Sequence, residues 1–309
     1  MPDRTVPLFL LAAFVAACST DSVNPSSGNS RVLLIDAPFP YDSVARVDIY
    51  VMSVSASLAT DTSASAPAGS FSTLATPGRR INMLGLQNGV SDQLGAVTLP
   101  NGAVKAVRMV IDTDSSSITL KDGTVLTGRS SPGIQWQSSA GRPTLEALIH
   151  EQILVPDSGA TIVIDFDVGK SFITPQEINA ASTDRGFIFS PVLRAADGAR
   201  TGSVAGIVRA HAESGAPVKD ASLRLYLGTP GTPENTWSML ATAKTDASGA
   251  FKFSYVTRSS WWAAIAAQAG KKYIIAADPP RASGLGRSIV PNLSVSAGVE
   301  TNAGLVVLP

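Results

Sequence analysis

Short apolar runs, separated by clusters of Gly, Pro, Asn, Asp and Ser, recur along the chain from Arg31 onward. In the clearest run, Val47, Ile49 and Val51 occupy alternate positions, which is the period of a half-buried β-strand. Neither a long amphipathic helix nor a regular alternation of strands and helices is present in the pattern. We therefore predict an all-β chain. Other expected strands of its first part are Val32–Ile35, Val104–Ile111, Ser117–Leu120, Thr161–Val168 and Phe187–Leu193.

Local motifs predict a few turns and short helices. Asp122-Gly123, between two apolar runs, is a hairpin signal. The segment Thr174–Glu177 has a capping-box pattern with Pro at the first helical position, which opens a short helix. We expect a second short helix over Arg79–Leu86. The segment Trp261–Ala269 fits either a helix, through its Ala content, or a strand, through its Trp pair.

A polar, Gly-containing stretch, Ala195–Thr201, separates two strand-rich regions and predicts a domain boundary. We expect one β-sandwich domain over residues 31–196 and a second over residues 202–309. Roughly seven strand-like runs in the second region suit a small sandwich.

The first residues indicate export. Leu8–Ala17 is an apolar run too short to span a bilayer, which takes about 20 residues, and it has the length of a signal-peptide core. The tetrapeptide Val15-Ala16-Ala17-Cys18 resembles a bacterial lipobox. That resemblance implies a signal peptide over residues 1–17, cleavage before Cys18, and a lipid anchor in which the Cys18 thiol carries a diacylglyceryl group, with palmitate-type chains, through a thioether. An ordinary signal peptide, or a buried strand with an incidental Cys, are the alternatives.

Residues 18–30 are polar and Ser-rich, so we interpret them as the acylated Cys followed by a flexible tether. The expected location is the cell envelope, with the membrane as a partner through the lipid anchor. Ser19, by analogy with lipoproteins of Gram-negative bacteria, favours the outer membrane in such an organism.

Composition narrows the function classes. The 309 residues carry 24 basic and 24 acidic side chains, and charged residues make up only 16% of the chain. A nucleic-acid binder needs clustered Lys and Arg, so we exclude nucleic acid as a partner. A hydrophobic content of 44% excludes wholesale disorder. One Cys allows neither an intramolecular disulfide nor a thiolate zinc cluster.

The first region resembles a secreted family known as domain of unknown function 4382. The likeness rests on four blocks in order: LLIDAPFPYDSV (33–44), INMLGLQNG (81–89) followed by LPNGAVKAVRMVID (99–112), VIDFDVGKSFI (163–173) and FSPVLRA (189–195). Val104 stands where the family usually has an aromatic residue. The resemblance implies a domain without implying a reaction.

The second region resembles the carboxypeptidase regulatory-like modules, which are prealbumin-like or carbohydrate-binding-like sandwiches. The resemblance rests on GSVAGIVRAHAESGAPVKDASLRLYLG (202–228) and TDASGAFKFSYV (245–256). In the second block Asp246 can cap the turn, Gly249 can take a positive φ, and Phe251 and Phe253 point to one face as core. The resemblance implies a spacer or accessory unit, and some relatives of the fold bind glycans. The expected fold class is thus all-β, with two Ig-like or prealbumin-like sandwiches.

Asp165 and Asp167 are the candidate metal ligands. They share one face of a predicted strand, roughly 6.6–6.8 Å apart at Cα, and so need a nearby cation. Structural ion pairing is the preferred interpretation. A solvated face and a calcium site are alternatives. The cations available to the pair are Lys170, Arg108 and Arg194, and further calcium ligands would be Asp36, or Asp112 with Asp114.

The aromatic residues offer a candidate glycan platform. Trp261 and Trp262, with Tyr255, could stack on sugar rings if exposed, but core filling is the preferred interpretation for each Trp of the chain. His150 and His211 are the two His residues, and the chain lacks zincin, Gly-x-Ser-x-Gly and phosphate-loop motifs. We expect His150 on a sheet face and His211 exposed beside a Gly turn.

These observations predict a cell-envelope lipoprotein that is not an enzyme, needs no cofactor, and has a binding or scaffolding role toward an envelope protein or glycan. A carbohydrate-binding accessory lipoprotein is the alternative, and an envelope hydrolase comes third.

Overall fold

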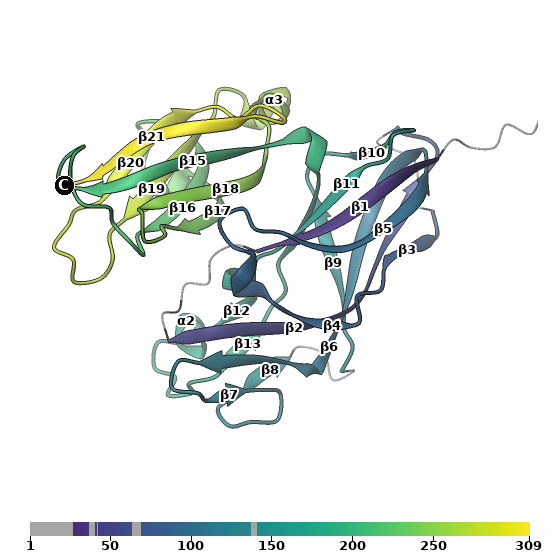
Figure 1. Ribbon diagram of the computed structural model, residues 1–309, viewed down its shortest axis with the longest axis horizontal. Coiled ribbons are helices and arrows are strands. Elements are labelled where there is room, and N and C mark those ends of the chain that lie inside the picture. The colour runs from purple at the N-terminus through teal and green to yellow at the C-terminus, as the bar shows by residue number, and fades with distance from the viewer. Residues whose placement is uncertain (1–26, 37–40, 42, 64–68, 137–140) are drawn as a thin grey trace, which may run out of the picture.

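The computed structural model describes residues 27–36, 41, 43–63, 69–136 and 141–309. It confirms the all-β fold class, with two β-sandwich units that follow one another along the chain (Figure 1). The predicted signal peptide, residues 1–17, and the predicted anchor Cys18 lie outside the described residues. Within the described ranges, no helix is long and apolar enough to cross a membrane.

Long strands dominate the first unit. Its strands are β1 (Ser27–Ile35), β2 (Val44–Ala59), β3 (Phe71–Ala75), β4 (Arg79–Asn82), β5 (Asp92–Pro100), β6 (Gly102–Leu120), β7 (Val125–Leu126), β8 (Ile134–Trp136), β9 (Thr144–Ile149), β10 (Ile153–Val155), β11 (Thr161–Phe166), β12 (Phe172–Ile173), β13 (Phe187–Phe189) and β14 (Leu193–Asp197). Its short helices are η1 (Met83–Leu86), α1 (Val168–Ser171) and α2 (Pro175–Ile178), and η2 (Gly198–Arg200) follows β14.

Both layers of this sandwich come from one rolled sheet, in the order β3-β2-β6-β9-β14-β11-β1-β5. The corner is β9, which pairs with β6 through Thr144–Ala147 and with β14 through Leu148 and Ile149. The two ends of the sheet approach each other, because a Cβ built on Gly95 of β5 would lie 2.8 Å from that of Ala75 of β3. Fully buried side chains fill the roll, among them Leu34, Ile49, Met109, Ile111 and Phe166.

The start of β1 corrects the predicted tether. The predicted tether, residues 18–30, extends too far along the chain, because Ser27–Ser30 belong to β1 and pair with Val97–Pro100 of β5. Packing explains the difference: Ser30 is buried, and its hydroxyl accepts the Ala160 N–H at 3.0 Å. A Ser-rich sequence gives no apolar signal for a strand of this kind.

Several local predictions are confirmed. Gly123 takes a φ of 88° in the hairpin between β6 and β7. Thr174 and Glu177 form the capping box of α2, with Pro at its start. The helix expected over Arg79–Leu86 was half wrong, because Arg79–Asn82 pair with β2 as strand β4 and only Met83–Leu86 are helical, as η1.

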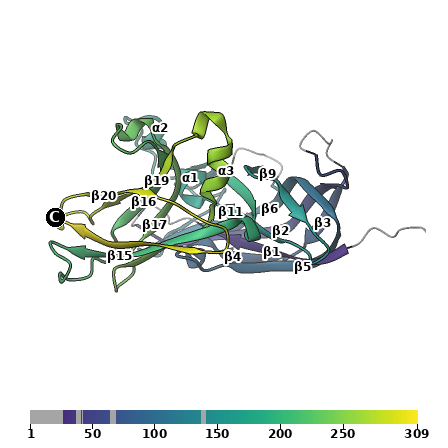
Figure 2. The ribbon, with the colours of Figure 1, turned by 90° about the horizontal axis from the view of Figure 1, so that it is seen from above.

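The second unit is a sandwich of two separate sheets. Its strands are β15 (Thr201–Ala210), β16 (Ser222–Gly228), β17 (Ser238–Lys244), β18 (Ala250–Thr257), β19 (Lys272–Asp278), β20 (Ser288–Leu293) and β21 (Glu300–Leu308), and its short helices are η3 (Glu234–Thr236), α3 (Ser259–Ala264) and η4 (Ala266–Gln268). One sheet has the order β18-β15-β21, and the other has the order β17-β16-β19-β20. In Figure 2, α3 and α2 project on the same side of the molecule.

The hairpin before β18 folds as its sequence predicts. The Asp246 carboxylate accepts the backbone N–H groups of Ser248 and Ala250 at 2.8 and 3.0 Å, and Gly249 has a φ of 77°. Phe251 and Phe253 are both buried, with ring centroids 5.8 Å apart. This hairpin therefore places two aromatic rings in the core of the second unit.

Candidate functional site

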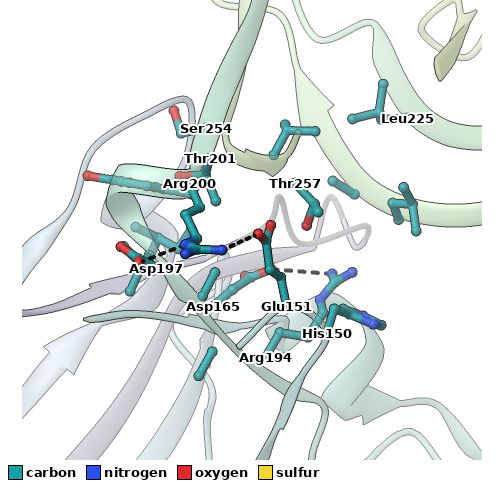
Figure 3. A pocket seen from close by; sticks show the side chains of 18 of the residues that line it. His150, Glu151, Asp165, Arg194, Asp197, Arg200, Thr201, Leu225, Ser254 and Thr257 are labelled. Atoms are coloured by element: carbon teal, nitrogen blue, oxygen red, sulfur yellow. Dashed lines mark hydrogen bonds and ion pairs between the residues drawn. The ribbon is translucent and has the colours of Figure 1, made fainter. Parts of the chain in front are cut away.

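The junction between the two units gathers charged and aromatic side chains that are distant in sequence. The turn between β9 and β10 brings His150 and Glu151, and β14 with η2 brings Arg194, Asp197 and Arg200. From the second unit, Arg258 lies between β18 and α3, and Trp262 lies on α3. Figure 3 shows how the side chains of the first unit and the linker point toward a common space.

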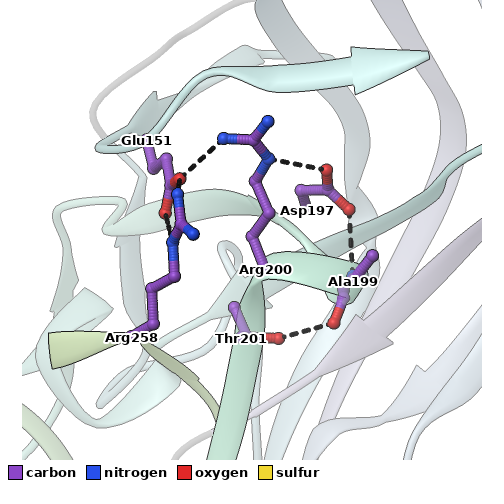
Figure 4. Close-up of polar contacts among 7 residues, drawn as sticks. Glu151, Asp197, Ala199, Arg200, Thr201 and Arg258 are labelled. Atoms are coloured by element: carbon purple, nitrogen blue, oxygen red, sulfur yellow. Dashed lines mark hydrogen bonds and ion pairs between the residues drawn. The ribbon is translucent and has the colours of Figure 1, made fainter. Parts of the chain in front are cut away.

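Glu151 is the centre of this junction. Its side chain is only 8% exposed, and its carboxylate binds Arg200 Nη1 at 2.8 Å. Arg258 reaches the same carboxylate through Nη2 at 2.5 Å and Nε at 3.3 Å. Figure 4 shows the two guanidinium groups meeting at Glu151. One carboxylate of the first unit thus holds an arginine of the linker and an arginine of the second unit.

Asp197 fixes the linker next to this carboxylate. Its Oδ1 accepts the Ala199 N–H at 2.9 Å and caps η2, while its other oxygen lies 3.6 Å from Arg200 Nε (Figure 4). Burial raises the pKa of Asp197, against the lowering effects of the Ala199 N–H and of Arg200. Arg200 is therefore held between two carboxylates, which orients it toward Glu151.

An aromatic contact lies beside the ion pairs. The His150 ring approaches Trp262 with centroids 5.6 Å apart, and partial burial, followed by the nearby Arg194 charge, lowers the pKa of His150. The Trp262 indole N–H donates to the Tyr273 hydroxyl at 2.7 Å, and that hydroxyl donates to the Thr257 carbonyl. Burial raises the pKa of Tyr273. These bonds fix Trp262 as part of the wall of the junction.

The junction encloses a cavity of about 80 Å³. Sites for drug-sized ligands are typically about 300–1,000 Å³, whereas one water needs only about 10–15 Å³. The size of this cavity suits a few waters between the charged groups and does not suit a sugar or a peptide side chain together with its backbone.

A close backbone approach adds to the contact between the units. Gly89, in the turn after η1, has a φ of 92°, and a Cβ there would lie 3.0 Å from Ser254 Oγ and 3.1 Å from Lys252 Cδ. Any side chain at this position would push against β18. The turn after η1 and the Glu151 ion pairs therefore approach the second unit at different places.

The predicted acidic pair is engaged by cations. Arg194 lies 3.2 Å from Asp165 and 3.6 Å from Asp167, and Lys170 lies 3.1 Å from Asp167. Asp167 also caps α1 by accepting the Lys170 N–H at 3.0 Å. Burial raises the pKa of Asp165, and Arg194 partly offsets this rise. Ion pairing, the preferred interpretation of the sequence, is thus the arrangement observed.

The other proposed metal ligands have their own contacts. Asp36 accepts the Val168 N–H at 3.0 Å, Asp112 accepts the Asp114 N–H at 3.0 Å, and Asp114 pairs with Arg129 at 3.0 Å. In the part of the chain that the structure describes, no three or more His, Cys, Asp or Glu side chains are grouped as metal ligands would be. Arg108, another predicted partner of the pair, instead lies 3.8 Å from Glu146.

The structure separates the predicted glycan platform. Trp262 is 7% exposed and belongs to the core of the second unit, and Trp261 is partly buried against the same core. Tyr255, on β18, lines the 80 Å³ cavity. The platform alternative is therefore wrong for Trp262 and core filling is the arrangement observed, because the segment folds as α3 and turns this indole inward, toward Tyr273.

Sequence reasoning missed Glu151, Arg200 and Arg258. The ion pair between Glu151 and Arg258 joins residues 107 positions apart, so local spacing carries no signal for it. The only available indication was that Arg200 stands in the predicted boundary, Ala195–Thr201.

The family model for the domain of unknown function DUF4382 matches residues 27–191. None of the curated proteins matches the sequence.

Among solved structures, the chain is similar to the minor pilin GBS52 of Streptococcus agalactiae, with 10% identity over 90% of this chain and 95% of that chain and a TM-score of 0.22. It is also similar to the shaft pilin SpaA of Lactobacillus rhamnosus GG, with 10% identity, coverage of 91% and 97%, and a TM-score of 0.24. A 9R-lipoxygenase from Cyanothece has 14% identity over 46% of this chain, a TM-score of 0.24, and only 19% of its own length covered. TM-scores this low do not indicate a shared function.

Proposed function

The chain belongs to the family of the domain of unknown function DUF4382, and from this premise we propose that it is a cell-envelope lipoprotein with a non-catalytic binding or scaffolding role. In this proposal Cys18 carries the lipid anchor, and the outer membrane is its location in a Gram-negative organism. The second unit, whose sequence resembles carboxypeptidase regulatory-like modules, acts as the accessory unit that the first unit holds in place.

The observation that carries the proposal is the engagement of Glu151 by Arg200 and Arg258. A scaffold has to present its surfaces in a fixed relation, since ordering mobile parts on binding lowers affinity. A buried carboxylate that binds the linker and the second unit together supports such a fixed relation.

The chemistry at the junction supports a non-catalytic role. Glu151, Asp165 and Asp167 all face Arg or Lys partners, an arrangement that neutralises charge. A general base has to reach a substrate proton within about 2.6–3.2 Å, directly or through one water. The 80 Å³ cavity beside these groups leaves little room for a substrate to approach them. The carbohydrate-binding alternative is not supported by a specific observation, since Trp262 is buried.

The proposed anchor lies close to the first unit along the chain. Nine residue steps separate Cys18 from Ser27, where β1 begins, and a chain of that length spans at most about 32 Å. A body of this kind would stay within a few nanometres of the membrane surface. Two or three acyl chains on one Cys would anchor it stably, at about 0.8 kcal/mol per buried methylene.

Metabolic labelling of the full chain tests the proposal. We expect palmitate label and membrane fractionation for the wild type and for Ser19→Ala, which serves as the matched control. Cys18→Ser should lose the label and leave the membrane fraction. Palmitate retained on Cys18→Ser, or a wild-type chain found unlabelled with Met1 intact, would contradict the anchor.

A further inference from the structure

A groove lies between the two units, away from the Glu151 ion pairs. Its wider part, about 630 Å³, is lined by Lys121 of the first unit and by Ser222, Lys244 and Arg281 of the second. Ser222 and Lys244 also line a narrower part of about 390 Å³, which reaches Met239. Each part falls in the roughly 300–1,000 Å³ range of ligand sites, and such sites are frequent at domain interfaces.

Two exposed cations, one from each unit, line the wider part of the groove. Lys121 follows β6 and Arg281 follows β19, and both side chains are exposed. Among the described residues, neither has a carboxylate within ion-pair distance. Asp220 is the acidic residue lining this part, and it lies 3.8 Å from Lys219. In a chain with zero net charge, this pair of cations from two units is a local excess.

The narrower part is different, because its charges are paired. Lys170 binds Asp167 at 3.1 Å, and Arg224 binds Asp278 at 2.5 Å. Met239 is 39% exposed there, and a flexible thioether adapts to varied apolar partners. The groove therefore offers positive charge at one end and an apolar contact at the other.

We propose that this groove binds an extended acidic peptide segment of a partner protein. One carboxylate of the peptide lies between Lys121 and Arg281, and an apolar side chain packs on Met239. This inference rests on the proposed binding role and names its partner class. The peptide's charge complements the exposed cations, and charge-assisted hydrogen bonds to Arg are among the strong ones.

Two observations favour a peptide over an acidic glycan. β17, which carries Met239, is an edge strand of its sheet, and an extended backbone can lie along such an edge. Tyr41, the aromatic side chain lining the groove, packs edge-on against Phe187 with centroids 5.3 Å apart, and its hydroxyl donates to Glu177. Its ring therefore packs within the first unit and is not positioned to stack on a sugar.

Fluorescence anisotropy with the purified full chain tests this inference. The probe is a fluorescein-labelled hexapeptide of alternating Glu and Leu, and an oligogalacturonate of equal charge serves as the glycan probe. We expect saturable peptide binding that weakens at high salt. Lys121→Gln/Arg281→Gln should bind the peptide about tenfold more weakly. Met239→Ser should weaken binding of this peptide but leave that of a hexaglutamate unchanged.

The matched control is Lys271→Gln/Arg142→Gln, which removes the same two charges from residues that do not line the groove. It should stay within twofold of the wild type. Absence of saturable peptide binding, equal weakening by both double variants, or tighter binding of the oligogalacturonate would overturn the proposal. Because the purified chain is used, a negative result leaves the lipid-anchor test unaffected, and loss of acylation leaves this binding unaffected.

Discussion

Glu151 and Arg258 form an ion pair at 2.5 Å between the two units, and the Glu151 side chain is 8% exposed. Arg200, from the linker, binds the same carboxylate at 2.8 Å. This carboxylate is shielded from water and shared by two guanidinium groups. Removing one side of these ion pairs is costly, because the charge that remains is poorly solvated and has lost its partner. The relation between these residues therefore sets how firmly the two units are joined.

Removal of the Glu151 carboxylate should destabilise the chain. In Glu151→Ala, Arg200 and Arg258 lose their shared partner; both are about one-third exposed, so solvent recovers part of the loss. We expect a decrease of about 2 kcal/mol in the free energy of unfolding, measured by urea denaturation. The matched control is Glu146→Ala, whose exposed pair with Arg108 spans 3.8 Å. Its effect should stay below about 0.5 kcal/mol, and an equal loss in both variants would contradict this account.

Stability should fall in acid through Glu234. The Arg287 and Tyr226 side chains, which bind this carboxylate at 2.6 Å each, lower the pKa of Glu234 to about 2. A carboxyl with a lower pKa in the folded state contributes stability above its unfolded pKa and loses it as pH falls. The loss should thus occur from about pH 4.5 down to about pH 2.

The check is the pH dependence of urea unfolding, together with titration of Glu234 by NMR. Glu234→Gln should flatten the acid limb of the stability curve, while Glu213→Gln, at an exposed position in the loop after β15, should leave it as in the wild type. An unchanged acid limb in Glu234→Gln would count against the assignment.

Loss of the buried Tyr273 hydroxyl should lower the free energy of unfolding more than loss of an exposed tyrosine hydroxyl. It accepts the Trp262 indole N–H and donates to the Thr257 carbonyl, and Tyr273 is fully buried. Tyr273→Phe leaves both groups without this partner, so we expect a loss of about 1–3 kcal/mol in thermal or urea unfolding. The control, Tyr50→Phe, removes an exposed hydrogen bond to the Gly78 carbonyl and should cost much less. Equal costs would show that the hydrogen bonds around Trp262 are not a support of the junction.

Calcium should leave the melting temperature nearly unchanged. Asp165 and Asp167 already face Arg194 and Lys170, whose charges occupy the place that a cation would take. Scanning calorimetry of the full chain with calcium and with chelator tests this. A rise of many degrees at micromolar calcium would mean that the metal displaces these ion pairs, and it would revive the metal-site alternative.

Local sequence patterns predicted much of the fold. Alternation at Val47–Val51, the turn around Asp246 and the capping box at Thr174 each depend on residues that are near one another in the chain. The physical causes there are side-chain period, a carboxylate that accepts turn N–H groups, and a fixed proline φ. Such features are readable without knowing the tertiary contacts.

The candidate site was less predictable, since it depends on contacts across the chain. Lys170, three residues from Asp167, could be predicted as its partner. Arg194 could be proposed as a cation for the acidic pair, but the sequence did not show that it lies next to Asp167. Glu151 had no local signal for its arginines. Trp262 could be interpreted as either core or surface, and the hydrogen bond to Tyr273 decided for the core.

Through Arg200 and Arg258, we expect Glu151 to hold the two units in one relative orientation. Double electron–electron resonance, which measures the distances between two spin labels, tests this orientation. Cys18→Ser provides a background free of native Cys. The labels go on Val125→Cys in the first unit and Val299→Cys in the second, at residues that are 50% and 52% exposed. We predict one narrow distance distribution in this background and a broad one when Glu151→Ala is added. A distribution whose width is the same with and without the Glu151 carboxylate would contradict the claim.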